Sequence, residues 1–220
     1  MIDLDSTHVV LSMLRKILPE AFVAGGSFAA HLPPPATLAP AARRIEYDRV
    51  RHLAVEECLA MVVSAADLPA GTVIHHAQEG DRRWPHGFVG SVTDKATVVA
   101  AALAARTVVD LLGIDIERAD RGGRVLDESF IGTGIGPPGF DRTLATLITF
   151  SAKEAAFKAQ FAATRRQLGY LDIEIDWPSI SADELHARAR CRGLEVALAL
   201  RCAVAAPWVT TVALAGVAPA

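Results

Sequence analysis

Two acidic side chains near the middle of the chain are spaced to share one cation. Asp115 and Glu117 lie two residues apart in segment 112–117, whose alternation with Ile114 and Ile116 predicts a β-strand. Residues i and i+2 of a strand point to the same face, so both carboxylates would lie together while the isoleucines enter the core. Like charges at this spacing repel, and Mg²⁺ is commonly held by one or two carboxylates together with substrate phosphates. Spacing alone leaves two interpretations open, a magnesium site and a solvent-facing strand edge.

A third acid, Glu154, lies in the segment FSAKEAAFKAQF (150–161), which has helical periodicity. One interpretation is structural: Ser151 and Glu154 form a capping box, and Glu154 pairs with Lys158 one turn later. The aromatic residues of the segment would then form a core stripe: Phe150, Phe157 and Phe161. The other interpretation makes Glu154 a third metal ligand or a general base, with Lys153 and Lys158 holding phosphate oxygens.

Three further features carry weaker signals. Segment 134–139 matches G-x-G-x-x-G, but two prolines occupy the position where a helix would have to begin, which favours a flexible connector over a dinucleotide site. The adjacent pair His75 and His76 lacks a third ligand at metal spacing, which favours loop histidines. A basic group is compatible equally with a solvated helix face and with phosphate binding: Arg43, Arg44 and Arg51.

The elements that must position these residues mix helices with short strands. Periodicity predicts helices over 7–17, 41–63, 95–110 and 151–166. Strands are predicted over 71–75, 87–93, 112–117 and 172–177, followed by a hairpin of 195–204 with 208–217. Proline and glycine predict a loop over 31–40, a turn over 77–83 and a connection over 122–138. The fold class is therefore α+β, with two lobes of similar size over 1–111 and 112–220, each with a long helix and several strands.

Composition excludes several classes of protein. The 220 residues are 51% hydrophobic and 21% charged, which predicts a folded chain rather than a disordered one. A net charge of −3 argues against a nucleic-acid partner. The most apolar stretch, 96–113, contains Arg106 and Asp110, so we interpret it as a buried helix running into a strand and not as a membrane span. An acidic N-terminus argues against a secretory signal, and three widely spaced cysteines favour reduced thiols, so a cytoplasmic location is expected.

Four segments, in this order, resemble the 4′-phosphopantetheinyl transferases of the enterobactin/surfactin-synthetase-activating type. They are RRIEY with VRH (43–52), WPHGFVGSVT (84–93), GIDIE (113–117) and FSAKEAAFKA (150–159), with a looser similarity at LGYLD (168–172). Together they span more than half of the chain.

The resemblance implies a pseudo-twofold fold with the cofactor between the lobes. It also implies an Mg²⁺-dependent transfer of the phosphopantetheine arm of coenzyme A to a serine of an acyl or peptidyl carrier protein, with release of adenosine 3′,5′-bisphosphate. Such enzymes activate carriers of fatty-acid, polyketide, nonribosomal-peptide and siderophore synthesis. Two lobes in one chain make a monomer the expected state.

The same resemblance assigns roles to individual residues. Asp115, Glu117 and Glu154 would hold Mg²⁺, with Glu154 also the candidate base for the carrier serine. Lys158, assisted by Lys153, would stabilise the pyrophosphate. The remaining coenzyme A contacts would come from Arg44 and Arg51 for the phosphates, Ser91, Thr93 and the adjoining Asp94 for the 3′-phosphate, and Glu79, Gly80, Asp81 and Arg82 for the adenine.

The chain departs from the family pattern where an anion should bind. Asp94 stands in place of a phosphate-binding histidine, and His76 and Glu79 replace the usual lysines. Each exchange removes positive charge, so we expect weakened coenzyme A binding, with Lys95 as a partial compensation. Two other functions stay open: a non-catalytic protein that binds a carrier or a regulatory partner, and an Mg²⁺-dependent phosphohydrolase. Arg165 and Arg166 are a candidate dock for an acidic carrier.

Overall fold

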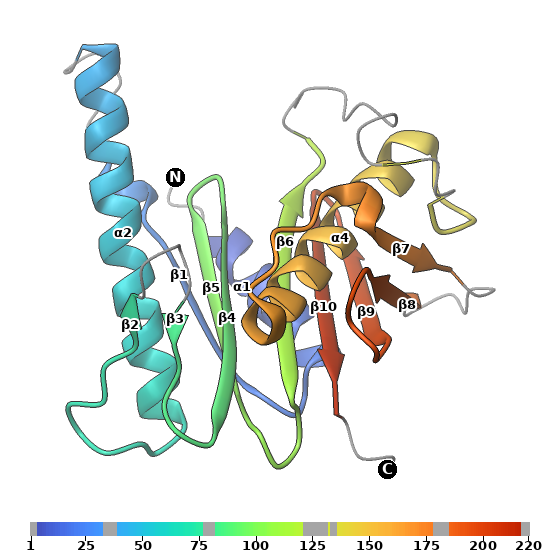
Figure 1. The fold of residues 1–220 in the computed structure, drawn as a ribbon. Coiled ribbons are helices and arrows are strands. Elements are labelled where there is room, and N and C mark those ends of the chain that lie inside the picture. The colour runs from blue at the N-terminus through green and yellow to red at the C-terminus, as the bar shows by residue number, and fades with distance from the viewer. Residues whose placement is uncertain are drawn as a thin grey trace.

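Two antiparallel sheets lie side by side and form the frame of the molecule (Figure 1). The computed structural model describes residues 4–32, 39–76, 82–120, 132, 136–177 and 185–216. The helices are α1 (Leu4–Ile17), α2 (Pro40–Ala65) and α4 (Arg142–Thr164), with short 3₁₀ helices η1 (Ala29–His31) and η2 (Tyr170–Asp172). The strands are β1 (Phe22–Ser27), β2 (His75–His76), β3 (Arg82–Arg83), β4 (Phe88–Lys95), β5 (Val98–Ala105), β6 (Leu111–Arg118), β7 (Ile173–Asp176), β8 (Leu185–Cys191), β9 (Leu198–Ala205) and β10 (Trp208–Ala215). The predicted α+β class, with two lobes, is confirmed.

Each sheet has its own covering helix, and one helix joins the two. The first sheet has the order β1-β5-β4 and packs against α2; the second has the order β6-β10-β9-β8-β7 and packs against α4 (Figure 1). On the opposite face, α1 places Val10, Leu14 and Ile17 in one core with strands of both sheets. Strands β4 and β6 meet where the sheets adjoin. Residues 91–95 and 114–117 are thereby brought together.

The segment predicted as a helix over 95–110 is instead the hairpin end of β4 and the strand β5, so that prediction was wrong. In β5, Val98, Ala100 and Ala102 pack against the α1 side, while Ala101 and Leu103 pack against α2. A central strand buried on both faces has no polar alternation, and its run of alanines has high helix propensity. Periodicity therefore could not separate the two conformations here.

Other elements also begin or end at residues different from the predicted ones. Helix α4 begins at Arg142, nine residues before the predicted start at 151, and Asp141 caps it by accepting a hydrogen bond from the Leu144 N–H at 3.0 Å. Ser151 is consequently buried inside the helix, and the capping box with Glu154 was wrong. Over 71–75, only His75 is in a strand, and β1 and β8 were not predicted. Helices over 7–17 and 41–63, the strand over 112–117 and the C-terminal hairpin are confirmed.

The predicted aromatic core stripe of α4 is confirmed only at Phe157, because the helix packs on its sheet mainly through small residues. Ala152, Ala155 and Ala159 are fully buried, whereas the three phenylalanines are half-buried. The small side chains let the helix axis lie close to β6. Within the described residues, no helix is long and apolar enough to cross a membrane.

Gly113 sets the distance between α4 and β6, and we predict that Gly113→Ala destabilises the fold. A Cβ at this position would lie 2.0 Å from the Ala155 carbonyl oxygen and 2.7 Å from the Ala159 nitrogen. Both are backbone atoms, so the helix itself must shift, at a cost of roughly 3 kcal/mol in the free energy of unfolding. Urea denaturation measures this cost. Gly26→Ala is the matched control, since no atom beyond the adjoining residues lies within 4 Å of a Cβ there. Equal losses in both variants would contradict the close-approach argument.

Candidate functional site

The two acids of β6 point to the same face, as the alternation predicts, and they are buried. Asp115 is 4% exposed and Glu117 is 5% exposed, while Ile114 and Ile116 lie in the core shared with α1. The solvent-facing alternative therefore does not hold. A buried pair of carboxylates is costly unless cationic partners accompany it.

Every second residue of β4 from Ser91 to Lys95 contacts β6 at the junction of the sheets. The Ser91 hydroxyl accepts a hydrogen bond from the Ile114 N–H at 3.0 Å, and the Thr93 hydroxyl donates to Asp115 Oδ1 at 3.3 Å. Next in this row, Lys95 forms an ion pair with Glu117. We call these contacts the β4–β6 seam. The segment expected to bind the 3′-phosphate thus has its two hydroxyls buried between the sheets.

Lys158 reaches the other acid from α4. Its ammonium lies 2.8 Å from Asp115 Oδ1 and donates a second hydrogen bond to the Ile114 carbonyl at 3.0 Å. The structural interpretation predicted an ion pair between Lys158 and Glu154 on the same helix. The contact of Lys158 with β6 replaces it. Asp115 and Glu117 therefore each have one lysine partner, from α4 and from β4.

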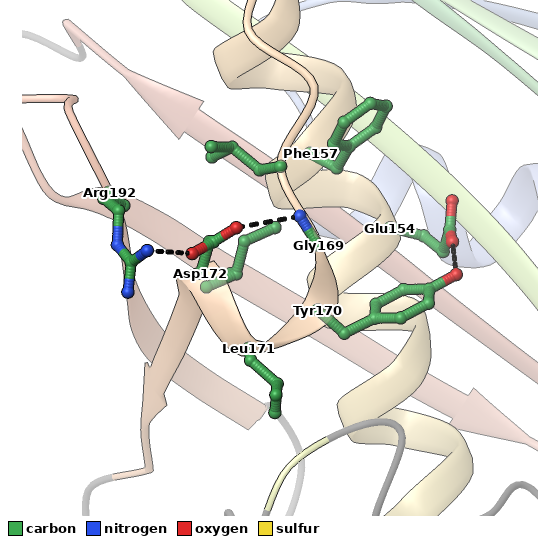
Figure 2. A pocket seen from close by; sticks show the side chains of 9 residues that line it. Glu154, Phe157, Gly169, Tyr170, Leu171, Asp172 and Arg192 are labelled. Carbon is green, nitrogen blue, oxygen red and sulfur yellow. Dashed lines mark hydrogen bonds and ion pairs between the residues drawn. The ribbon is translucent and has the colours of Figure 1, made fainter.

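Glu154 is held by a tyrosine from the turn that follows α4. The Tyr170 hydroxyl donates a very short hydrogen bond to Glu154 Oε1 (Figure 2). Burial, then this hydrogen bond, and then the negative charges of Glu154, Asp115 and Glu117 raise the pKa of Tyr170. The negative charges of the three acids therefore all act on the same hydroxyl, that of Tyr170. Lys153 is buried nearby, donates to the Tyr170 carbonyl at 2.8 Å and has its pKa lowered by burial.

A cavity of about 710 Å³ opens beside Glu154 (Figure 2). Its lining is largely apolar, and charged groups lie on opposite sides of it, Glu154 on one and Arg192 with Asp172 on the other (Figure 2). The apolar part of the lining includes Phe157, Leu168, Leu171 and the ring of Tyr170. The η2 wall is fixed because Asp172 accepts a hydrogen bond from the Gly169 N–H at 3.0 Å and pairs with Arg192 at 2.8 Å. The arrangement offers an apolar groove that ends at a carboxylate.

Two of the arginines expected to bind coenzyme A, Arg51 for a phosphate and Arg82 for the adenine, have acidic partners of their own. Arg51 forms a two-pronged ion pair with Asp94, at 2.8 and 2.9 Å, and Arg82 pairs with Glu56 at 3.2 Å. Arg44 is exposed near the start of α2. The rest of the expected adenine loop, Glu79, Gly80 and Asp81, lies outside the described residues. Asp94, the residue that departs from the family pattern, is thus the ion-pair partner of Arg51.

The β6 acids fit a divalent cation, on the chemistry of the oxygens that they present. Asp115 Oδ2 is buried and has no hydrogen-bond partner among the described residues. Burial first, and repulsion by Asp115 second, raise the pKa of Glu117 to about 7. Two buried carboxylates with a free oxygen suit Mg²⁺, which completes its shell with substrate phosphates and water. In the described ranges no three Asp, Glu, His or Cys residues form a metal-binding group, so Glu154 is not gathered with this pair.

Sequence reasoning missed two contacts at this site. Lys95 was noted only as a compensating charge, and Tyr170 only within a loose similarity. The spacing of Ser91, Thr93 and Lys95 carries a usable signal, because alternate residues of one strand face the same neighbour. The Tyr170 contact had no such signal, since it depends on how η2 folds back onto α4.

Without divalent cations, we expect stability to fall as pH rises from about 4.5 to about 7. The folded state holds the Glu117 proton more tightly than the unfolded chain, because the pKa of Glu117 is raised from 4.5 to about 7. Between these values folding takes up a proton, so raising the pH weakens folding, by on the order of 3 kcal/mol in total. Urea denaturation in chelator at about pH 5 and about pH 8 tests this. Glu117→Gln should flatten the profile, and an unchanged profile in that variant would refute the assignment.

No family model matches the chain. It is similar to a protein of Mycobacterium tuberculosis (strain ATCC 25618 / H37Rv), the 4′-phosphopantetheinyl transferase PptT, with 32% identity over 150 residues. The match covers 64% of this chain and 61% of that protein, so the chain spans about three fifths of its relative's length. The name of this relative agrees with the family that the four sequence segments resemble.

Proposed function

We propose that this chain is a 4′-phosphopantetheinyl transferase of the enterobactin/surfactin-synthetase-activating type. It would transfer the phosphopantetheine arm of coenzyme A to a serine of an acyl or peptidyl carrier protein. The observation that carries the proposal is the buried group of Asp115, Glu117 and Lys158 with Glu154 on the same helix. The similarity to PptT supports the same reaction.

In the proposed reaction the serine oxygen of the carrier attacks the β-phosphorus of coenzyme A. An oxygen–phosphorus bond forms to the arm, the pyrophosphate bond breaks, and adenosine 3′,5′-bisphosphate leaves. Glu154 takes the serine proton as general base. The Tyr170 hydroxyl fixes the position of the Glu154 carboxylate before the substrate arrives.

The remaining residues serve the phosphates and the arm. Asp115 and Glu117 would hold Mg²⁺, which when bound neutralises pyrophosphate charge and orients the leaving group. Lys158 supplies a fixed positive charge beside this pair. The apolar groove next to Glu154 is the proposed place for the pantetheine arm, and Lys153 braces its wall through the Tyr170 carbonyl.

The partner and its setting belong to the same proposal. The N-terminal lobe (1–111) would contribute Arg44, Arg51, Arg82 and the 91–94 segment to coenzyme A binding, and the C-terminal lobe (112–220) the metal-binding acids and the lysines. An acidic carrier would dock near Arg165 and Arg166, which are exposed at the end of α4. We propose a cytoplasmic monomer that activates carriers of polyketide, nonribosomal-peptide or siderophore synthesis.

One observation favours a second function. Because Asp94 occupies Arg51, the chain could bind a carrier or a regulatory partner without transferring the arm. Intact-mass spectrometry of purified apo carrier proteins, incubated with this protein, coenzyme A and Mg²⁺, separates the two. A mass gain of one phosphopantetheine, absent with Glu154→Ala, supports the transferase. Absence of any gain, together with no coenzyme A binding by calorimetry, supports the binding protein. Release of free phosphopantetheine without a carrier would indicate the hydrolase instead.

A further inference from the structure

Among the described residues, the ion pair of Lys95 with Glu117 is the one contact of the β4–β6 seam that joins a positive charge of the first sheet to an acid of the second. Its partner Glu117 is almost fully buried, whereas the Lys95 side chain is 41% exposed. The ammonium can therefore leave for solvent by rotating a flexible side chain, and Glu117 cannot follow it.

The backbone that carries Lys95 is held on both sides by α2. Arg51 clamps the preceding residue, Asp94, and the Tyr47 hydroxyl donates to the carbonyl of the following residue, Ala96, at 2.5 Å. Ala96 itself has a left-handed backbone at the turn between β4 and β5, with φ of 56°. The ammonium is thus tethered beside Glu117 from a fixed point, so its effective concentration there is high.

The other charges that face Glu117 are those of the seam and of α4. Asp115 repels it, and Lys158 attracts it but is bound to Asp115 Oδ1 and the Ile114 carbonyl. Lys95 is therefore the cation that balances Glu117 directly. A divalent cation that used Glu117 as a ligand would take the same oxygens and repel the ammonium.

We propose that Lys95 is a built-in counter-ion of Glu117 that competes with the divalent cation and sets the cation affinity of the site. Lys95 leaves Glu117 when the cation binds and returns when the cation leaves. The choice of cation rests on the proposed function; the competition itself rests on the contacts of Lys95. While no cation is bound, Lys95 balances the charge of Glu117, as Lys158 balances that of Asp115.

Titration calorimetry of chelator-treated protein with Mn²⁺ alone tests the competition. Lys95→Met and Lys95→Gln should each tighten Mn²⁺ binding by about tenfold or more, since a charge-assisted contact no longer has to be broken. Lys95→Arg keeps the charge and should bind as weakly as the parent. Lys16→Met is the matched control: it removes one positive charge from an exposed position of α1 and should leave the affinity unchanged.

A second measurement follows the lysine itself. Acylation of Lys95 by an amine-reactive ester, read by peptide mass spectrometry, should become several-fold faster when Mn²⁺ is added, while Lys16 should not respond. Equal Mn²⁺ affinity in Lys95→Met and the parent would overturn the proposal. So would equal tightening in Lys16→Met, or a Glu117→Gln variant that binds Mn²⁺ as the parent does. The transfer assay reads the proposed function separately, so a chain that transfers nothing but shows this order of affinities refutes only that function.

Discussion

Replacing Glu154 with glutamine is expected to lower the rate of phosphopantetheine transfer by about 10²- to 10⁴-fold. Glutamine has nearly the size and shape of glutamate, and its carbonyl oxygen can still accept the hydrogen bond from Tyr170. The groove and the turn at η2 are therefore retained, and only the capacity to take a proton is lost. The effect should fall on kcat, with coenzyme A affinity unchanged.

The measurement is the initial rate of mass gain on an apo carrier, with calorimetry of coenzyme A on the same variant. Glu195→Gln serves as the control, because it removes one carboxylate from an exposed position of the same lobe. A Glu154→Gln variant that retains the parent rate would exclude Glu154 as the base. Loss of coenzyme A affinity equal to the loss of rate would assign Glu154 to binding instead.

The parts of this site that the sequence predicts are those set by local periodicity. The placement of Asp115 and Glu117 on one face follows from strand alternation, and Glu154 and Lys158 share a helix because the segment around them repeats at helical spacing. These relations require only that each segment adopts its expected strand or helix. They fix which side chains share a face but not what lies opposite.

What lies opposite depends on contacts between segments far apart in the chain. Helical spacing predicts an ion pair between Lys158 and Glu154. The close approach of α4 to β6 at Gly113 instead places the Lys158 ammonium 2.8 Å from Asp115 Oδ1. An exposed helix pair contributes only a few tenths of a kcal/mol, whereas a buried carboxylate without a partner costs several times more. The long-range contact therefore prevails, and no window along the sequence contains it.

The strand β5 shows the same limit for secondary structure. Its alanines favour a helix locally, but the chain has α1 on one side and α2 on the other, and a strand between them buries both rows of side chains. The pairing with β4 over residues 88–95 also satisfies the backbone groups. Tertiary burial decides the conformation, and it is not visible until both helices are placed.

Replacing Asp94 with histidine is expected to tighten coenzyme A binding by about 10- to 100-fold. Asp94 uses both carboxylate oxygens on Arg51, so the guanidinium that the proposed function assigns to a coenzyme A phosphate is already occupied. Removing the acid releases the arginine fork and takes away a negative charge, and histidine adds a hydrogen-bond donor. One or two charge-assisted hydrogen bonds of roughly 1.5–3 kcal/mol each account for the expected change.

Asp94→Asn separates the two contributions. It releases the charge pairing of Arg51 without adding an imidazole, so it should give part of the gain, and the remainder in Asp94→His belongs to the new ring. Glu46→Gln is the matched control: Glu46 holds Arg49 through the same two-pronged geometry, at 2.6 and 2.9 Å, on the same helix. Releasing Arg49 should leave coenzyme A affinity as it is.

Calorimetric titration of coenzyme A into the parent and these three variants at low and moderate salt gives the result. If both Asp94 variants bind coenzyme A no better than the parent, Arg51 does not serve a phosphate, and the 91–95 segment binds something other than the anion that the resemblance implies. If Asp94→Asn and Asp94→His tighten equally, the released arginine alone explains the gain. In that case Asp94 acts through its ion pair with Arg51. The expected weakness of the proposed coenzyme A site then depends on α2 as much as on β4, because the contact that anchors the β4 hairpin also occupies the arginine.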